Sequence, residues 1–115
     1  MGNLSGKVAV VTGAARGMGA KFAERLAQDG ADVIAIDILD SSDTLKLIEA
    51  TGKKGKAFQI DITSEQQVND MAKAVEAEFG PIHILVNNAG LHPKPMPVEE
   101  LTYEFYKKYI AHRAL

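Results

Sequence analysis

Three glycines in one short stretch have a spacing that suits the binding of a ligand. Gly13, Gly17 and Gly19 fall in a TGxxxGxG stretch that starts at Thr12. Glycine lets the backbone adopt positive φ and lets a ligand approach without meeting a Cβ. If a helix begins here, its unpaired N–H groups and partial positive charge suit a bound diphosphate. The stretch therefore predicts a turn that binds an anion.

A carboxylate follows these glycines in the sequence at a distance that is typical of a ribose-binding acid. Asp37 follows Gly19 by 18 residues and ends the apolar run Asp32–Asp37, which reads DVIAID. In a doubly wound sheet, ligands bind beyond the carboxyl ends of the strands, and an acid about 20 residues past the glycines accepts hydrogen bonds from ribose hydroxyls. A carboxylate also repels a 2′-phosphate, so Asp37 favours NAD over NADP. The plain alternative is a surface aspartate that ends a strand.

Strand and helix patterns alternate along the chain, which is typical of a parallel sheet covered by helices. Val8–Val11, closed by Thr12, is an apolar run suited to a strand buried on both faces. Three further strands are expected, at Asp32–Asp37, Lys56–Ile60 and His83–Val86, and three helices, at Gly19–Asp29, Ser41–Thr51 and Glu65–Phe79. Thr63 or Ser64, with Gln66 or Gln67 three residues later, predicts a capping box at the last of these helices.

Composition excludes several classes of protein. The 115 residues suffice for one modest core, and 13 basic against 15 acidic residues leave no positive excess for nucleic acid. There is no cysteine, and His83, His92 and His112 lack ligand-like spacing, so we expect no metal site. Met1–Lys7 is polar and no apolar run reaches membrane-spanning length, which favours a cytoplasmic protein without a membrane partner.

Four motifs occur together in a recognisable order. TGxxxGxG at Thr12–Gly19 is followed by Asp37, by Asp61-Ile62 after the third expected strand, and by NNAG at Asn87–Gly90. In this order and spacing, residues 5 to 110 resemble the nucleotide-binding half of the short-chain dehydrogenase/reductase family. Alone, the NNAG motif would be read as a plain turn. The resemblance implies an α/β fold, a Rossmann-like doubly wound parallel sheet truncated to about four strands in the order 3-2-1-4.

The resemblance also implies roles for individual residues around a nicotinamide dinucleotide. Asp37 would hold the adenosine ribose, Asp61 would take the adenine amino group beside Ile62, and Thr12 and Asn87 would tie strand ends together. The diphosphate would be surrounded by Gly13, Arg16, Gly17, Met18 and Gly19, and the floor beside the ribose would be lined by Asn88, Ala89 and Gly90. Arg16 points toward NADP, because NADP users of the family often carry a basic residue just before the second glycine. Asp37 outweighs it, since no Lys or Arg follows until Lys46. We expect NAD as the cofactor and NADP as the less favoured one.

No catalytic residue is predicted. The family's chemistry belongs to a Ser, a Tyr-x-x-x-Lys pair and an Asn, and the Tyr passes a proton to or from the substrate oxygen as hydride moves. Tyr103 and Lys107 have the Tyr-x-x-x-Lys spacing, but they follow NNAG too closely and amphipathic packing of a helix explains them. No serine occurs after Ser64, and Arg113 stands where the family carries its helix-borne Asn.

The chain is expected to form one domain, with a cofactor-binding core at 5–90, a Pro-rich loop at 91–97 and a terminal helix at 98–112. The leading hypothesis is the NAD-binding part of an alcohol or carbonyl oxidoreductase whose catalytic half is missing. The alternatives are a non-catalytic dinucleotide-binding or interaction module and a truncated product without a stable fold. The apolar strand His83–Val86 and the aromatic residues Phe105 and Tyr109 favour self-association, or pairing with a missing C-terminal half.

Overall fold

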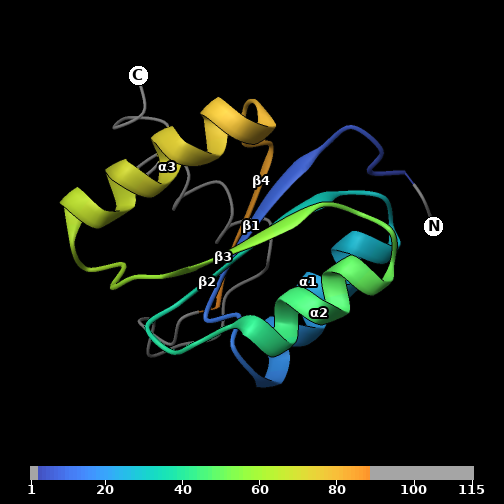
Figure 1. The fold of residues 1–115 in the computed structure, drawn as a ribbon, viewed down its shortest axis with the longest axis horizontal. Coiled ribbons are helices and arrows are strands. Elements are labelled where there is room, and N and C mark those ends of the chain that lie inside the picture. Colours follow the sequence, from blue (N-terminus) through green and yellow to red (C-terminus); the bar gives the residue numbers. More distant parts are fainter. Residues whose placement is uncertain (1–2, 89–115) are drawn as a thin grey trace.

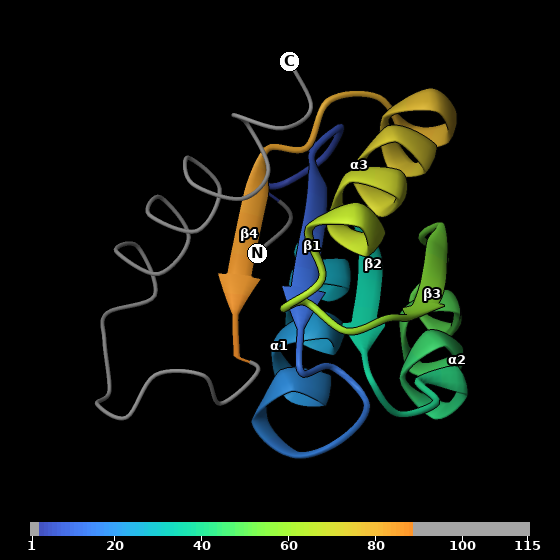
Figure 2. The same cartoon turned by 90° about the vertical axis from the view of Figure 1, so that its left-hand side faces the viewer.

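Four parallel strands form the centre of the computed structural model, which describes residues 3–88. The strands are β1 (Val8–Thr12), β2 (Asp32–Asp37), β3 (Gly55–Gln59) and β4 (Ile84–Asn87). They are hydrogen-bonded in the order β3-β2-β1-β4, and all four arrowheads point the same way in Figure 2. The predicted order 3-2-1-4 and the Rossmann-like fold class are confirmed.

Helices cover both faces of this sheet. Helices α1 (Gly17–Gln28) and α2 (Ser42–Ala50) lie on one face, and α3 (Glu65–Phe79) lies on the other (Figure 1). Successive residues of a strand point to opposite faces, so each strand feeds two cores. On β1, Val10 packs in the core under α3, whereas Val11 packs in the core under α1 and α2. This burial on both faces explains why β1 reads as a continuous apolar run.

The predicted element boundaries are confirmed for β2 and α3 and differ by one or two residues elsewhere. The helix expected from Gly19 begins at Gly17, because its glycine-rich first turn lacks the apolar periodicity that reveals the rest. The third strand is one residue earlier than expected, since pairing with β2 runs from Gly55 to Gln59. The fourth is one residue later, because its pairing with β1 ends at Asn87 opposite Thr12.

The predicted capping box at α3 is only half formed. Ser64 Oγ accepts a hydrogen bond from the Gln67 N–H at 3.3 Å, as expected of an N-cap. The Gln67 side chain does not return to Ser64; its Oε1 accepts from the Asp61 N–H at 2.7 Å. The Ser64 N–H instead donates to Asp61 O at 3.0 Å. The reason is the tight turn after β3, which brings Asp61 closer to the first turn of α3 than a simple cap requires.

The predicted loop at 91–97 and helix at 98–112 lie outside the described residues. Within residues 3–88, no helix is long and apolar enough to cross a membrane. Over the same residues, no cluster of His, Asp and Glu side chains could hold a metal ion.

Candidate functional site

A cavity of about 490 Å³ opens where the carboxyl ends of the four strands meet. Each strand end contributes to its wall: Gly13 follows β1, Asp37 ends β2, Asp61 follows β3 and Asn88 follows β4. The lining residues that the sequence predicted are Gly13, Arg16, Asp37, Asp61, Ile62 and Asn88, and those that it did not predict are Ile38, Leu39, Ile60 and Thr63. The cavity is therefore at the place where open α/β sheets bind ligands.

The glycine-rich turn forms one side of this cavity. Gly13 and Gly17 have φ of 62° and 63°, a region that other residues rarely adopt. A Cβ added at Gly19 would lie 1.9 Å from Gly13 O and 2.8 Å from Asn88 Nδ2, so only glycine lets the helix start pass so close to the turn. A Cβ at Gly17 would meet no atom of residues 3–88 within 4 Å, so these residues leave open space at the start of the helix.

The start of α1 is free of competing groups from its own side chains. Its N-cap residue, Arg16, makes no side-chain capping hydrogen bond, and the first turn contains no acid. The first N–H groups of any helix lack partners within the helix. Together with the helix dipole, they make this end of α1 a fitting place for a diphosphate.

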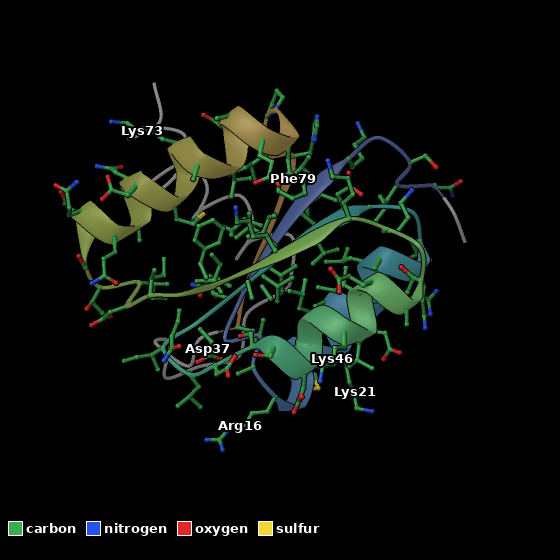
Figure 3. The ribbon with its side chains drawn as sticks, viewed as in Figure 1. Arg16, Lys21, Asp37, Lys46, Lys73 and Phe79 are labelled. Carbon is green, nitrogen blue, oxygen red and sulfur yellow. The ribbon has the colours of Figure 1, made fainter. Side chains whose placement is uncertain are left out.

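Asp37 is held by two backbone N–H groups at the end of β2. Its Oδ2 accepts from the Ala15 N–H at 2.8 Å, and its Oδ1 accepts from the Leu39 N–H at 3.0 Å. Because an ionised carboxylate accepts about four hydrogen bonds, each oxygen keeps room for one more. The carboxylate is thus oriented in advance and still able to accept two hydroxyl donors. Figure 3 shows Arg16 extending outward below the turn, away from Asp37.

Asp61 lies across the cavity in a turn closed by Thr63. Its Oδ1 accepts from the Thr63 N–H at 2.9 Å and from Thr63 Oγ1 at 2.7 Å. The hydroxyl of Thr63, and then its backbone N–H, lower the pKa of the Asp61 carboxyl, because both donors favour the charged form. Both bonds use Oδ1, and among the described residues Oδ2 has no donor. Asp61 therefore presents a charged acceptor.

Apolar side chains line the space between the two carboxylates. Ile38 and Leu39 are 64% and 44% exposed, although they are large apolar residues. They lie beside Ile60 and Ile62 in the lining of the cavity. A planar, mostly apolar ring such as adenine would cover such surface. Of these four residues only Ile62 was predicted, and the others differ from ordinary surface or core residues only in their position next to Asp37 and Asp61 at two strand ends.

The end of β4 is tied to the end of β1, as expected for Thr12 and Asn87. Thr12 Oγ1 donates to Asn87 Oδ1 at 2.9 Å and accepts from the Asn88 N–H at 2.9 Å. Asn88 Nδ2 also lies 3.4 Å from Gly13 O. These bonds fix the cavity wall at Asn88 against the glycine-rich turn.

Some predicted residues do not line the cavity. Gly17, Met18 and Gly19 are absent from its lining, and the Met18 side chain is 62% exposed. Ala89 and Gly90 lie outside the described residues, as do Tyr103, Lys107 and Arg113.

A comparison with protein families shows to which family the chain belongs. The sequence model described as short chain dehydrogenase matches residues 7–112. The chain belongs to the short-chain dehydrogenase family. Galactitol 2-dehydrogenase of Agrobacterium fabrum is 43% identical over 105 residues, which cover 91% of this chain and 40% of that protein. A 3-oxoacyl-[acyl-carrier-protein] reductase of Vibrio cholerae is 43% identical over 89 residues, or 77% of this chain and 36% of that protein.

Solved short-chain dehydrogenases share the fold. A short chain dehydrogenase from Mycobacterium paratuberculosis bound to NAD superposes with a TM-score of 0.75 at 32% identity and covers 94% of this chain and 45% of that one. NAD⁺-bound xylitol dehydrogenase gives a TM-score of 0.74 at 28% identity, with 93% and 42% covered. The chain spans about two fifths of the length of the curated short-chain dehydrogenases that it matches.

Proposed function

We propose that this chain supplies the NAD(H)-binding part of a short-chain dehydrogenase that moves hydride between nicotinamide and an alcohol or ketone. The observation that carries the proposal is the Asp37 carboxylate, oriented by two N–H groups in a cavity that faces the glycine-rich turn. NAD-bound relatives with the same fold support it.

The residues around the cavity fit the parts of the dinucleotide. The open start of α1, with Gly13, Gly17, Met18 and Gly19 and the cation of Arg16, would hold the diphosphate. Asp37 would accept the adenosine ribose hydroxyls, and the second oxygen of Asp61 would accept the adenine amino group beside Ile62. Asn88, Ala89 and Gly90 would continue the wall toward the second ribose. Bound nicotinamide supplies the hydride donor or acceptor.

The cofactor is NAD rather than NADP in this proposal. A 2′-phosphate would bring its negative charge against the Asp37 carboxylate, and the cation of Arg16 extends away from that carboxylate (Figure 3). Titration calorimetry of the chain with NAD and with NADP tests this. We expect NAD to bind more tightly. Tighter NADP would show that Arg16 decides the preference, and binding of neither would refute the proposed function.

We further propose that residues 1–115 bind the dinucleotide without turning over alcohols by themselves. None of the described residues that line the cavity is a Ser, Tyr or Lys able to pass a proton to a substrate oxygen. The same observation supports a second candidate function, a dinucleotide-binding module that catalyses no reaction of its own. Steady NADH formation from a secondary alcohol, lost in Tyr103→Phe, would contradict the proposal. Hydride transfer that appears only when a relative's C-terminal half is added would favour the oxidoreductase over the module.

A further inference from the structure

The peptide group between Ala14 and Ala15 is held at both ends by side chains from two different elements. Its carbonyl oxygen, Ala14 O, accepts a hydrogen bond from Thr44 Oγ1 of α2 at 2.6 Å. Its N–H, on Ala15, donates to Asp37 Oδ2 at the end of β2 at 2.8 Å. The described residues contain no cis peptide bond, and a planar trans peptide directs its C=O and N–H to opposite sides. A donor that fixes the carbonyl therefore fixes the direction of the N–H.

Thr44 is well placed to impose this orientation. Its side chain is 1% exposed and Ala14 is fully buried, so water does not compete for the Ala14 carbonyl. A threonine in a helix divides between two χ1 rotamers, and in this structure Thr44 has the one that places its hydroxyl on Ala14 O. The nearest other acceptor, Ala15 O, lies 3.4 Å from the hydroxyl, which is a much poorer bond. The short bond to Ala14 O therefore sets the peptide plane.

Thr44 acts on the cavity without being part of it. It is absent from the cavity lining, whereas Asp37, two hydrogen bonds away, lines it. Successive hydrogen bonds polarise one another, so the bond to Ala14 O strengthens the bond that Ala15 donates to Asp37. If the Ala15 N–H turned away, Asp37 would keep, among the described residues, only the Leu39 N–H as an orienting donor.

We propose that Thr44 is a positioning residue that orients the Asp37 carboxylate for the adenosine ribose through the Ala14–Ala15 peptide. Helix α2 then sets the affinity for the dinucleotide although it touches none of it. This inference rests on the proposed function, because it assumes that Asp37 receives the ribose hydroxyls.

The test compares Thr44→Val with a matched control at the C-cap of the same helix. Thr51 Oγ1 donates to Ile48 O at 2.6 Å, so Thr51→Val removes a bond of the same length far from the turn. Calorimetry of each protein with ADP and with 2′-deoxy-ADP separates an effect on the ribose hydroxyl from a general loss. We expect Thr44→Val to weaken ADP at least about fivefold and about threefold more than it weakens 2′-deoxy-ADP. Thr51→Val should change either affinity less than about twofold, and Thr44→Ser should restore ADP to nearly the unmodified affinity.

Hydrogen exchange of the Ala15 amide gives a second readout that needs no ligand. The amide should be protected in the unmodified protein and in Thr44→Ser, and should exchange at least about tenfold faster in Thr44→Val. Thr44→Ala replaces Thr44→Val if circular dichroism shows that the latter does not fold. Equal losses for both nucleotides, or unchanged protection of Ala15, would overturn the inference. If the unmodified protein binds neither nucleotide, the proposed function fails, and the exchange rate alone decides whether Thr44 orients the peptide.

Discussion

Asp37 has two tasks, since its carboxylate fixes the glycine-rich turn through Ala15 and, in the proposed function, receives the ribose. Asp37→Ala should therefore weaken NAD by about 1–3 kcal/mol, the size of a lost charge-assisted hydrogen bond with its orienting contacts. The gap between NAD and NADP should narrow, because the repelling charge is gone. Calorimetry measures both, and Asp70→Ala removes the same charge from the exposed side of α3 as a control. An unchanged NAD affinity would show that Asp37 only ends a strand.

Gly19 allows a test that does not depend on any ligand. Gly19→Ala would place a methyl group 1.9 Å from a backbone oxygen, so the turn or the helix must shift. Gly52→Ala is the matched control, because its Cβ would meet nothing and only its φ of 88° opposes the change. We expect Gly52→Ala to cost about 1–2 kcal/mol of unfolding free energy, and Gly19→Ala to cost clearly more. Urea unfolding of both variants measures the difference, and equal costs would mean that the close approach is absent in solution.

The charge of Asp61 should depend on Thr63. Hydrogen bonds from Thr63 lower the pKa of Asp61 in the folded chain. The carboxylate therefore stabilises the fold when the pH is above the ordinary pKa that Asp61 has in the unfolded chain. That contribution is lost as the pH falls through the lowered pKa. Thr63→Val removes the hydroxyl and keeps the N–H, so the pKa of Asp61 should rise toward its usual range. Carboxyl ¹³C chemical shifts followed against pH measure this, and an unshifted titration would contradict the contact.

At the scale of elements, α3 fixes the turn after β3 through one side chain. Gln67 Oε1 accepts from the Asp61 N–H at 2.7 Å, and its neighbour Gln66 instead bonds to Asp70 on the helix surface. Gln67→Ala should loosen the Asp61 turn and weaken NAD severalfold, whereas Gln66→Ala should leave NAD binding unchanged. Both variants share the effect of alanine on helix stability. A difference between their NAD affinities, measured by calorimetry, therefore reports the loosened Asp61 turn. Similar affinities in the two variants would argue against a role for this bond.

The helices and strands could be predicted closely because their apolar residues occur at the spacing typical of each element. The apolar residues of α3 recur at helical spacing between Ser64 and Gly80, and the sequence predicts both ends of this helix correctly. The start of α1 could not be predicted, because a glycine-rich first turn has no apolar face. The reach of Gln67 to Asp61 depends on how the turn after β3 folds, which no local pattern encodes.

The candidate site was predictable where a residue type has a distinctive chemical use. A glycine and an acid at strand ends indicated Gly13 and Asp37, and the resemblance to the family indicated Asp61. The apolar Ile38 and Leu39 gave no such signal, since isolated apolar residues on a surface are common. Thr44 could not be found from the sequence at all, because its partner lies 30 residues away and only the packing of α2 brings them together.

For the whole molecule, the two outer strands of the described sheet differ in their protection. β3 carries Lys56, which forms an ion pair with Glu78 at 2.9 Å, whereas Ile84–Asn87 contains no charge. We expect residues 1–115 to self-associate through β4. Leu85 is fully buried, so a charge there would unfold the domain, and the half-buried Ile84 is the position to change.

Sedimentation at increasing concentration tests this expectation. Ile84→Lys should shift the protein toward monomer, because a charge disfavours pairing at that edge. Gln59→Lys adds the same charge to the exposed end of β3 and should have no effect. A monomer at high micromolar concentration, with dispersed amide resonances, would rule self-association out.

The hydrogen bond between Thr12 and Asn87 also has a consequence for the order in which the strands can pair during synthesis. It joins residues 75 positions apart, while the β1–β2 pairing joins residues only about 24 apart, such as Val8 and Asp32. At a synthesis rate of 5–20 residues per second, β4 leaves the ribosome about 4 to 15 s after β1. During that interval one edge of the apolar strand VAVVT has not yet paired with β4. Such an unpaired edge can pair with another chain, and nascent chains on neighbouring ribosomes are nearby. The last of the described strands to be made is the one that ends this exposure.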